Sequence, residues 1–200
     1  MFEPDIIIEM EYKEIEVRFL EIDKEELIKN LHKIGADDLG EDFLREVIFY
    51  DKAGKFRDKH KFVRLRENKN GAILTYKQHM SKGRGINQID DVDEIETKVD
   101  DPQSTKLLLD KIGLDPFRVQ EKYRHSFIFN GTQIEIDTWP KIPTYVEIES
   151  SSEEIIKNVS KKLGLAWKDV YYGSARDAIE KIYKIPVSKY RYFTFDKVGD

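Results

Sequence analysis

Hydrophobic and polar residues alternate along several short runs of this chain, which is typical of β-strands whose two faces meet different surroundings. The runs are bounded by turn residues and span Met10–Leu20, Leu44–Asp51, Lys61–Glu67, Ala72–His79, Asp91–Val99, Gln120–Phe129, Thr132–Thr138 and Tyr145–Glu149. Two of the connections, at Asn68–Gly71 and Asn130–Gly131, are typical of hairpin turns. The pattern therefore predicts eight strands that pair in antiparallel fashion.

Segments with helical spacing separate these runs. Helix-capping residues begin three of them, at Asp23, Asp101 and Ser152, and Pro102 fits the first helical position of the second. A glycine follows the end of each, at Gly35, Gly113 and Gly164. A last short helix is expected over Arg176–Tyr183. With no linker-like segment, we predict one α+β domain over residues 1–185, and a tail over 186–200 that docks or adds an edge strand.

Composition narrows the class of protein. The 200 residues carry 34 Lys and Arg against 39 Asp and Glu, a net charge of −5, which argues against general affinity for nucleic acid or membrane surfaces. The chain has no cysteine, so disulfides and thiolate metal sites are excluded. No run approaches the ~18 apolar residues that a membrane span needs. We expect a cytoplasmic monomer or homodimer.

Charged residues gather on one face of nearly every predicted strand. Residues two apart share a face, and the resulting pairs are mostly of one sign: Arg64 and Arg66, Thr75 and Lys77, Glu94 and Glu96, Lys122 and Arg124, Glu135 and Asp137, Glu147 and Glu149. If the strands close into a barrel with the charged face inward, the lumen suits a polyanion with its divalent metal. The opposite arrangement gives an apolar barrel with charges in solvent. Periodicity alone leaves both open.

The first strand carries Glu14, Glu16 and Arg18 on one face. Two carboxylates about 7 Å apart along a strand repel each other unless a cation lies between them. Hard oxygen ligands suit Mg²⁺ or Mn²⁺. A solvated strand face is the plain alternative for this stretch.

These motifs, in this order, resemble the CYTH superfamily, the triphosphate tunnel metalloenzymes, over about residues 10 to 185. Glu14-x-Glu16-x-Arg18 resembles the family's N-terminal E-x-E-x-K signature. The later landmarks are Phe49-Tyr50-Asp51, Arg64-x-Arg66, Lys77, Glu94-x-Glu96, Lys122-x-Arg124, Asp137 and Glu147-x-Glu149. The resemblance implies a single-domain, eight-stranded antiparallel β-barrel, the triphosphate tunnel, with helices packed outside.

The resemblance also implies roles for these residues. Mg²⁺ or Mn²⁺ would be bound by Glu14, Glu16, Glu147 and Glu149, with Glu94, Glu96 and Asp137 as nearby ligands. The triphosphate would be bound by Arg18, Arg64, Arg66, Lys77, Lys122 and Arg124. Lys77, with Tyr50, is the candidate for positioning or deprotonating the attacking water. Arg18 stands where the family usually has lysine; it keeps the charge and the phosphate contact but cannot accept a proton.

Two enzymatic activities fit this resemblance. The first is metal-dependent hydrolysis of inorganic, nucleoside or thiamine triphosphate, and we favour it because it demands fewer features. The second is a class IV adenylate cyclase, which forms cyclic AMP and pyrophosphate from ATP. A non-catalytic polyphosphate or nucleotide binder is a third possibility, although pure anion binding would not need so many carboxylates. All three have a small-molecule triphosphate as partner.

Overall fold

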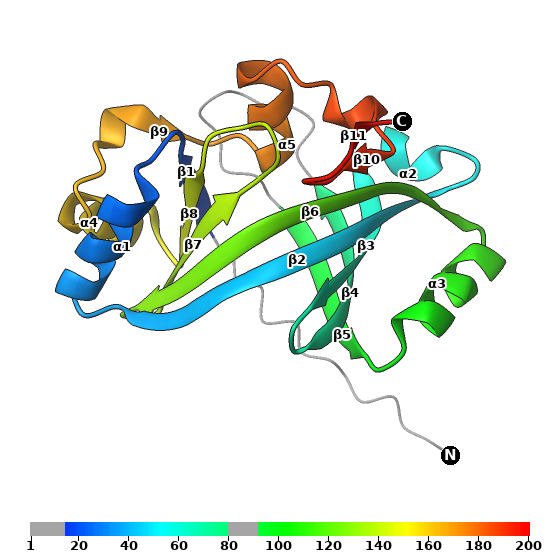
Figure 1. Ribbon diagram of the computed structural model, residues 1–200, viewed down its shortest axis with the longest axis horizontal. Coiled ribbons are helices and arrows are strands. Elements are labelled where there is room, and N and C mark those ends of the chain that lie inside the picture. The colour runs from blue at the N-terminus through cyan, green and yellow to red at the C-terminus, as the bar shows by residue number, and fades with distance from the viewer. Residues whose placement is uncertain (1–14, 80–91) are drawn as a thin grey trace.

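The computed structural model describes residues 15–79 and 92–200, so Glu14 and the segments 1–14 and 80–91 lie outside the described residues. Nine strands follow one hydrogen-bonded path in the order β5-β4-β3-β2-β6-β7-β8-β1-β9 (Figure 1). All pairs along this path are antiparallel. The strands are β1 (Ile15–Phe19), β2 (Asp37–Asp51), β3 (Lys61–Asn68), β4 (Gly71–His79), β5 (Val92–Val99), β6 (Leu114–Phe129), β7 (Thr132–Thr138), β8 (Tyr145–Ser150), β9 (Val170–Tyr171), β10 (Tyr192–Phe193) and β11 (Val198–Gly199).

The predicted α+β class and the antiparallel arrangement of β1 to β8 are confirmed, but the sheet is not closed. Strands β5 and β1 stand toward opposite ends of the path and do not pair within the described residues. The outer edge of β1 pairs with β9 instead, through Arg18 and Phe19. The expected barrel is therefore an open, curved sheet in the described part of the chain.

Strands β2 and β6 are longer than the alternation predicts. They pair from Asp37 opposite Ile128 to Asp51 opposite Leu114, so β2 begins well before the predicted run Leu44–Asp51. The pairing shifts register between Ile48 and Phe49. Irregularities of this kind let a long strand pair continue past residues that fit poorly, such as Pro116.

The helices begin and end close to where the capping residues predict. They are α1 (Lys24–Lys33), α2 (Lys55–Asp58), α3 (Pro102–Lys111), α4 (Glu153–Lys162) and α5 (Ala175–Asp177), with short turns η1 (Trp167–Asp169), η2 (Ala178–Ile182) and η3 (Val187–Lys189). Asp23 accepts from the Glu26 N–H at 3.0 Å, and Ser152 from the Ile155 N–H at 3.3 Å. The short α2 was not predicted. Over the described ranges, none of the helices has the length and hydrophobicity that crossing a membrane requires.

Helices cover the outer face of the sheet at two places. At one end, Val17 of β1 and Ile148 of β8 pack with Leu31 of α1 and Ile156 of α4 in one core. In Figure 1, α1 and α4 lie together beside β1, β7 and β8, and α3 lies at the other end. There Phe49, Leu65 and Leu109 form a second core. The apolar faces therefore lie under the helices, which leaves the charged faces to line the inside of the curve.

The C-terminal segment packs against the sheet. Strand β10 pairs in parallel with β6, Tyr192 opposite Val119, and also pairs with β11. Phe193 is completely buried and its ring stacks on Trp139, with centroids 6.0 Å apart. In this third core, Val187 of η3 packs with Trp139 and Phe193.

Candidate functional site

Asp137 is the most enclosed charged residue on the inner face, with no exposed surface. Arg124 donates to both of its oxygens, from Nε to Oδ1 at 2.7 Å and from Nη2 to Oδ2 at 2.6 Å. Lys122 donates to Oδ2 at 2.6 Å, and the Tyr145 hydroxyl also donates to it at 3.3 Å. Alternation on β6 and β7 brings these groups together, because Arg124 lies directly opposite Asp137 in the strand pairing. Two basic residues are thus held in place by one carboxylate.

Arg18 on β1 links two carboxylates. Its Nε donates to Glu147 Oε1 at 2.8 Å, its Nη2 pairs with Glu16, and its Nη1 donates to the Gly173 carbonyl at 2.7 Å. Glu147 also accepts from Arg124 Nη2 at 2.8 Å. Arg18 and Arg124 are therefore joined through Glu147. A lysine, the usual family residue at position 18, could not make the same set of contacts from one planar group.

Strands β3, β4 and β5 form the opposite wall of the site. Arg64 Nη2 lies 3.4 Å from Glu94 and 3.5 Å from Glu96, and Arg66 Nη2 lies 3.2 Å from Glu96. Lys77 Nζ lies 2.7 Å from Glu94 Oε2. This wall is more open to solvent: the Glu96 side chain is 40% exposed, against 0% for Asp137.

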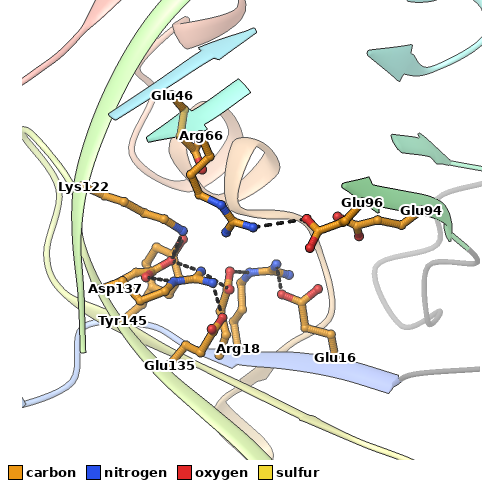
Figure 2. A network of polar contacts seen from close by, with 12 residues as sticks. Glu16, Arg18, Glu46, Arg66, Glu94, Glu96, Lys122, Glu135, Asp137 and Tyr145 are labelled. Atoms are coloured by element: carbon orange, nitrogen blue, oxygen red, sulfur yellow. Dashed lines mark hydrogen bonds and ion pairs between the residues drawn. The ribbon is translucent and has the colours of Figure 1, made fainter. Parts of the chain in front are cut away.

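The two walls face each other across the inside of the curved sheet. Figure 2 shows Arg66 of β3 directed toward Glu96 of β5, both on the open wall. Arg18 and Glu16 lie on β1 below them, and Lys122 enters from the side. A charge on the opposite wall also reaches Glu16: Lys77 of β4 opposes the rise in the pKa of Glu16 that burial causes. The structure thus brings together the predicted basic residues from β1, β3, β4 and β6.

Two carboxylates in this network have pKa values shifted away from the ordinary value of a glutamate. Burial inside the curve, added to the neighbouring Glu147 charge, outweighs Arg18 and raises the pKa of Glu16 to about 7. Burial would also raise the pKa of Glu147, but Arg18 and Arg124 overcome it and hold that pKa well below its ordinary value. In the same way Asp137, Glu135 and Glu147 outweigh burial and raise the pKa of Arg124. Arg18 and Arg124 thus compensate the charge of Glu147 more fully than Arg18 compensates that of Glu16.

Two of the predicted site residues, Glu149 and Tyr50, lie in different surroundings. Glu149 lies opposite Glu16 in the pairing of β8 with β1, so it stands on the same inner face. Tyr50, expected to act with Lys77, packs against Phe117 with ring centroids 5.5 Å apart. The described residues show neither a hydrogen bond between Tyr50 and Lys77 nor one from Tyr50 to the acidic groups. Tyr50 instead lines a separate pocket near α2.

Sequence reasoning missed Glu46, which is 1% exposed on the inner face of β2. Its Oε2 accepts from Gln120 Nε2 at 2.5 Å, and its Oε1 lies 3.6 Å from Arg64 Nη1. Glu46 Oε1 and Arg64 Nε are buried without a hydrogen-bond partner. In the sequence, Glu46 could have been recognised as a single acidic residue inside an apolar run, two positions before Ile48 and four before Tyr50. Glu135 was also left out, although it pairs with Arg124.

A divalent metal needs several oxygen ligands close together. Among residues 15–79 and 92–200, no three acidic or histidine side chains lie together in a metal-binding arrangement. The chemistry of the set nevertheless fits, because Glu16, Glu147 and Glu149 present carboxylate oxygens on neighbouring strands. The raised pKa of Glu16 indicates a carboxylate that a cation would stabilise in its charged form. Glu14, the remaining expected ligand, lies outside the described residues.

The chain is similar to known proteins in sequence and in fold. The model of the CYTH domain matches residues 12–183. The chain belongs to the CYTH family. A protein of Methanocaldococcus jannaschii, provisionally named an adenylate cyclase, is 24% identical over 143 residues, which are 71% of this chain and 79% of that protein.

Solved CYTH structures share the fold. A protein of Pyrococcus horikoshii has a TM-score of 0.65 at 25% identity, over 80% of this chain and 96% of that chain. A Hippeastrum protein, provisionally named an adenylyl cyclase and described as having a dominant triphosphatase activity, has a TM-score of 0.60 at 16% identity, over 85% of this chain and 95% of that one.

Proposed function

We propose that this CYTH protein is a metal-dependent triphosphatase, in which water attacks the terminal phosphorus of a triphosphate held inside the curved sheet. The observation that carries the proposal is the gathering of six cations on the inner face of the curved sheet: Arg18, Arg64, Arg66, Lys77, Lys122 and Arg124. These cations come from four different strands. Each of these cations is paired with a carboxylate and is not left open to solvent. Positive and negative side chains therefore lie close together on this face.

The basic residues would bind and align the phosphates. Phosphoryl transfer needs positioning and neutralisation of developing charge more than covalent chemistry from the protein. Arg64 and Arg66 suit this role best, because the carboxylates that hold them, Glu94 and Glu96, lie on the more exposed wall. There a phosphate can displace a carboxylate at modest cost, since exposed ion pairs are weak. Arg124, buried with Asp137, would instead keep a fixed position.

Glu16, Glu147 and Glu149 would hold Mg²⁺ or Mn²⁺, consistent with the general metal dependence of the family. When bound, such an ion supplies charge neutralisation at the phosphate oxygens and activation of a water molecule. Lys77 is the candidate to position that water, since its Nζ lies on the open wall beside Glu94. Among the described residues, Tyr50 makes no contact that supports a shared role with Lys77.

The rival activity is cyclisation of ATP. It is favoured by the name of the Methanocaldococcus jannaschii relative, whereas hydrolysis agrees with the activity described for the Hippeastrum protein. Both reactions use the same phosphate-binding residues and differ in which phosphorus is attacked. The attacking group is water in the first and the ribose hydroxyl in the second.

One assay separates these activities. The purified protein is incubated with tripolyphosphate, ATP and thiamine triphosphate, with and without Mg²⁺ or Mn²⁺. We expect metal-dependent release of orthophosphate. Cyclic AMP with pyrophosphate would identify a cyclase, and binding without turnover would identify a sensor; either result contradicts the proposal.

The acidic site is tested by Glu16→Gln, which keeps the shape of the side chain but removes a ligand charge. We expect at least a hundredfold loss of metal-dependent turnover, on the scale seen when a transition-state charge contact is removed. Glu25→Gln is the matched control, because Glu25 is an exposed carboxylate in the first turn of α1. Equal activity of the two variants would show that Glu16 has no metal role.

A further inference from the structure

A separate pocket lies at one end of the inner face. It has a volume of about 350 Å³ and is lined by residues from β2, β3, α2, α5 and η3. Four of its lining residues are cations, Arg57, Lys61, Arg176 and Lys189, and none is Asp or Glu. We call it the cationic pocket. In Figure 1, α2 lies beside the C-terminal strands, which shows how segments far apart in the sequence meet here.

The cationic pocket continues the face that carries the phosphate-binding residues. Val63 and Leu65 of β3 point into the apolar core, so Phe62, a lining residue, shares the inner face with Arg64. Strand β6 is joined to the pocket as well: Arg118 Nη1 donates to the Val187 carbonyl at 3.1 Å, directly before the lining residues of η3. Phe62 and Arg64 are two residues apart on one strand face, about 7 Å, so the pocket lies next to the main site.

Aromatic residues of the pocket hold one of its cations, Arg57, in place. The Arg57 guanidinium lies 3.9 Å from the centroid of the Phe117 ring and 4.7 Å from that of Tyr50. The Lys61 side chain leaves on the other face of β3, with Val63 and Leu65, and its Nζ lies 4.4 Å from the centroid of Phe56 in the second core. Cation–π contacts of this kind position a positive charge without neutralising it. Because Arg57 covers these ring faces, they are not available for stacking of a planar base.

Carboxylates do not compensate the four cations. Within the described part of the chain, Arg57, Lys61, Arg176 and Lys189 take part in none of the ion pairs, unlike the cations of the main site. On the pocket wall, Glu180 Oε1 accepts from the Ser188 N–H at 2.7 Å. A group of uncompensated cations in a concave space attracts an anion.

We propose that the cationic pocket binds a phosphate group beyond the three held in the main site, so that the protein prefers phosphorylated chains longer than a triphosphate. This inference rests on the proposed function, because it takes Arg64 and Arg66 as phosphate ligands. The additional phosphate could belong to inorganic polyphosphate or to a nucleotide with a further phosphate on its ribose. The chemistry that the pocket recognises is the same in both.

The test is calorimetric titration in buffer without divalent metal, where metal-dependent turnover cannot interfere. The probes are tripolyphosphate, a longer linear polyphosphate, ATP, and ATP with a further 3′-phosphate. The variant is Arg176→Ala with Lys189→Ala. The matched control is Lys29→Ala with Lys33→Ala, which removes the same charge from exposed positions of α1.

We expect the pocket variant to bind longer probes about five- to tenfold more weakly, the scale of losing two partly exposed charge contacts. Binding of tripolyphosphate and ATP should stay within about twofold of the wild type. The control variant should leave the ratio between long and short probes unchanged. Loss only with longer polyphosphate identifies the inorganic chain as the ligand, and loss only with the phosphorylated ATP identifies the nucleotide.

Other outcomes separate this inference from the proposed function. An unchanged ratio in the pocket variant overturns the cationic pocket while leaving the triphosphatase standing. Weaker binding of every probe in equal measure also overturns it. If tripolyphosphate fails to bind but the variant still weakens the longer chain, the main site is wrong and the pocket stands. Lys189→Ala alone removes one exposed cation and should give part of the loss, should the double variant fold poorly.

Discussion

Single residues in this protein differ in function according to how their charge is compensated. Asp137 and Glu147 are surrounded by arginine and lysine, and each holds two cations in place. Burial, with the Glu147 charge nearby, raises the pKa of Glu16 although Arg18 is a close cationic partner. Glu46 is different again, since one oxygen binds Gln120 while the other faces Arg64 beyond hydrogen-bond distance. It therefore stabilises Arg64 through charge.

Glu46 offers a test at this scale. Glu46→Gln should lower the free energy of unfolding by about 2–4 kcal/mol near neutral pH, because it leaves buried cations uncompensated. Burial would raise the pKa of Glu46, but Arg64, Lys122 and Arg66 lower it from 4.5 to about 2. Its stabilisation is therefore complete above pH 4.5 and is lost as the pH falls toward 2.

Urea unfolding of wild type and variant across this pH range checks the prediction. The difference between the two should narrow as the pH falls below 4.5. A difference that stays constant with pH would mean that Glu46 acts through shape and not through charge. Glu41→Gln, an exposed acidic residue on the same strand, is the control and should change stability little.

Among the elements, the paired strands β2 and β6 connect the two parts of the molecule. Their inner face carries Glu46, Lys122 and Arg124, and the outer face reaches into both helix-covered cores. The C-terminal strand β10 joins β6 from the side and places η3 against Arg118. A short tail thus completes a wall of the cationic pocket.

This role of the tail leads to a prediction about Phe193. Because its ring is fully buried against Trp139, Phe193→Ala should cost about 3–5 kcal/mol of stability. Phe195→Ala, two residues further on the same tail, is the control, since Phe195 is 40% exposed. Thermal unfolding of both variants is the measurement. Similar unfolding temperatures would show that the tail does not contribute to the folded core.

For the whole molecule, the distribution of charge sets the response to ligands. The wall formed by β6, β7, β8 and β1 is deeply buried, while the wall formed by β3, β4 and β5 is partly open. Cations on both walls point into one space, held by carboxylates. A polyanion with a divalent cation satisfies the two sets of charges together, so binding should stabilise the folded state.

We therefore expect tripolyphosphate with Mg²⁺ to raise the unfolding temperature. At a ligand concentration of about 100 times Kd the stabilisation is about 2.7 kcal/mol, which corresponds to about 5–10 °C for a chain of this size. Orthophosphate at equal ionic strength is the control and should give a much smaller shift, because one phosphate reaches fewer cations. Equal shifts would indicate general screening and not a site.

Local patterns account for much of this structure. Period-two alternation correctly placed Arg64 with Arg66 and Lys122 with Arg124 on shared faces, since side chains on a strand must alternate. The ends of α1, α3 and α4 followed from their caps and terminal glycines, which act within a few residues. Family membership could be recognised because the motifs keep their order along the chain.

Other features depend on contacts between distant segments. Alternation does not say which face turns inward; α1 and α4 decided that by covering the apolar side, and α4 lies far along the chain from β1. The extra length of β2 came from its partner β6, and Tyr50 was drawn to Phe117 and Arg57 by that same pairing and by α2. The sequence thus determined which residues share a face, because this depends on neighbouring bonds. Only the tertiary structure decided what each face meets, because burial and charge compensation arise between residues that the chain itself does not bring together.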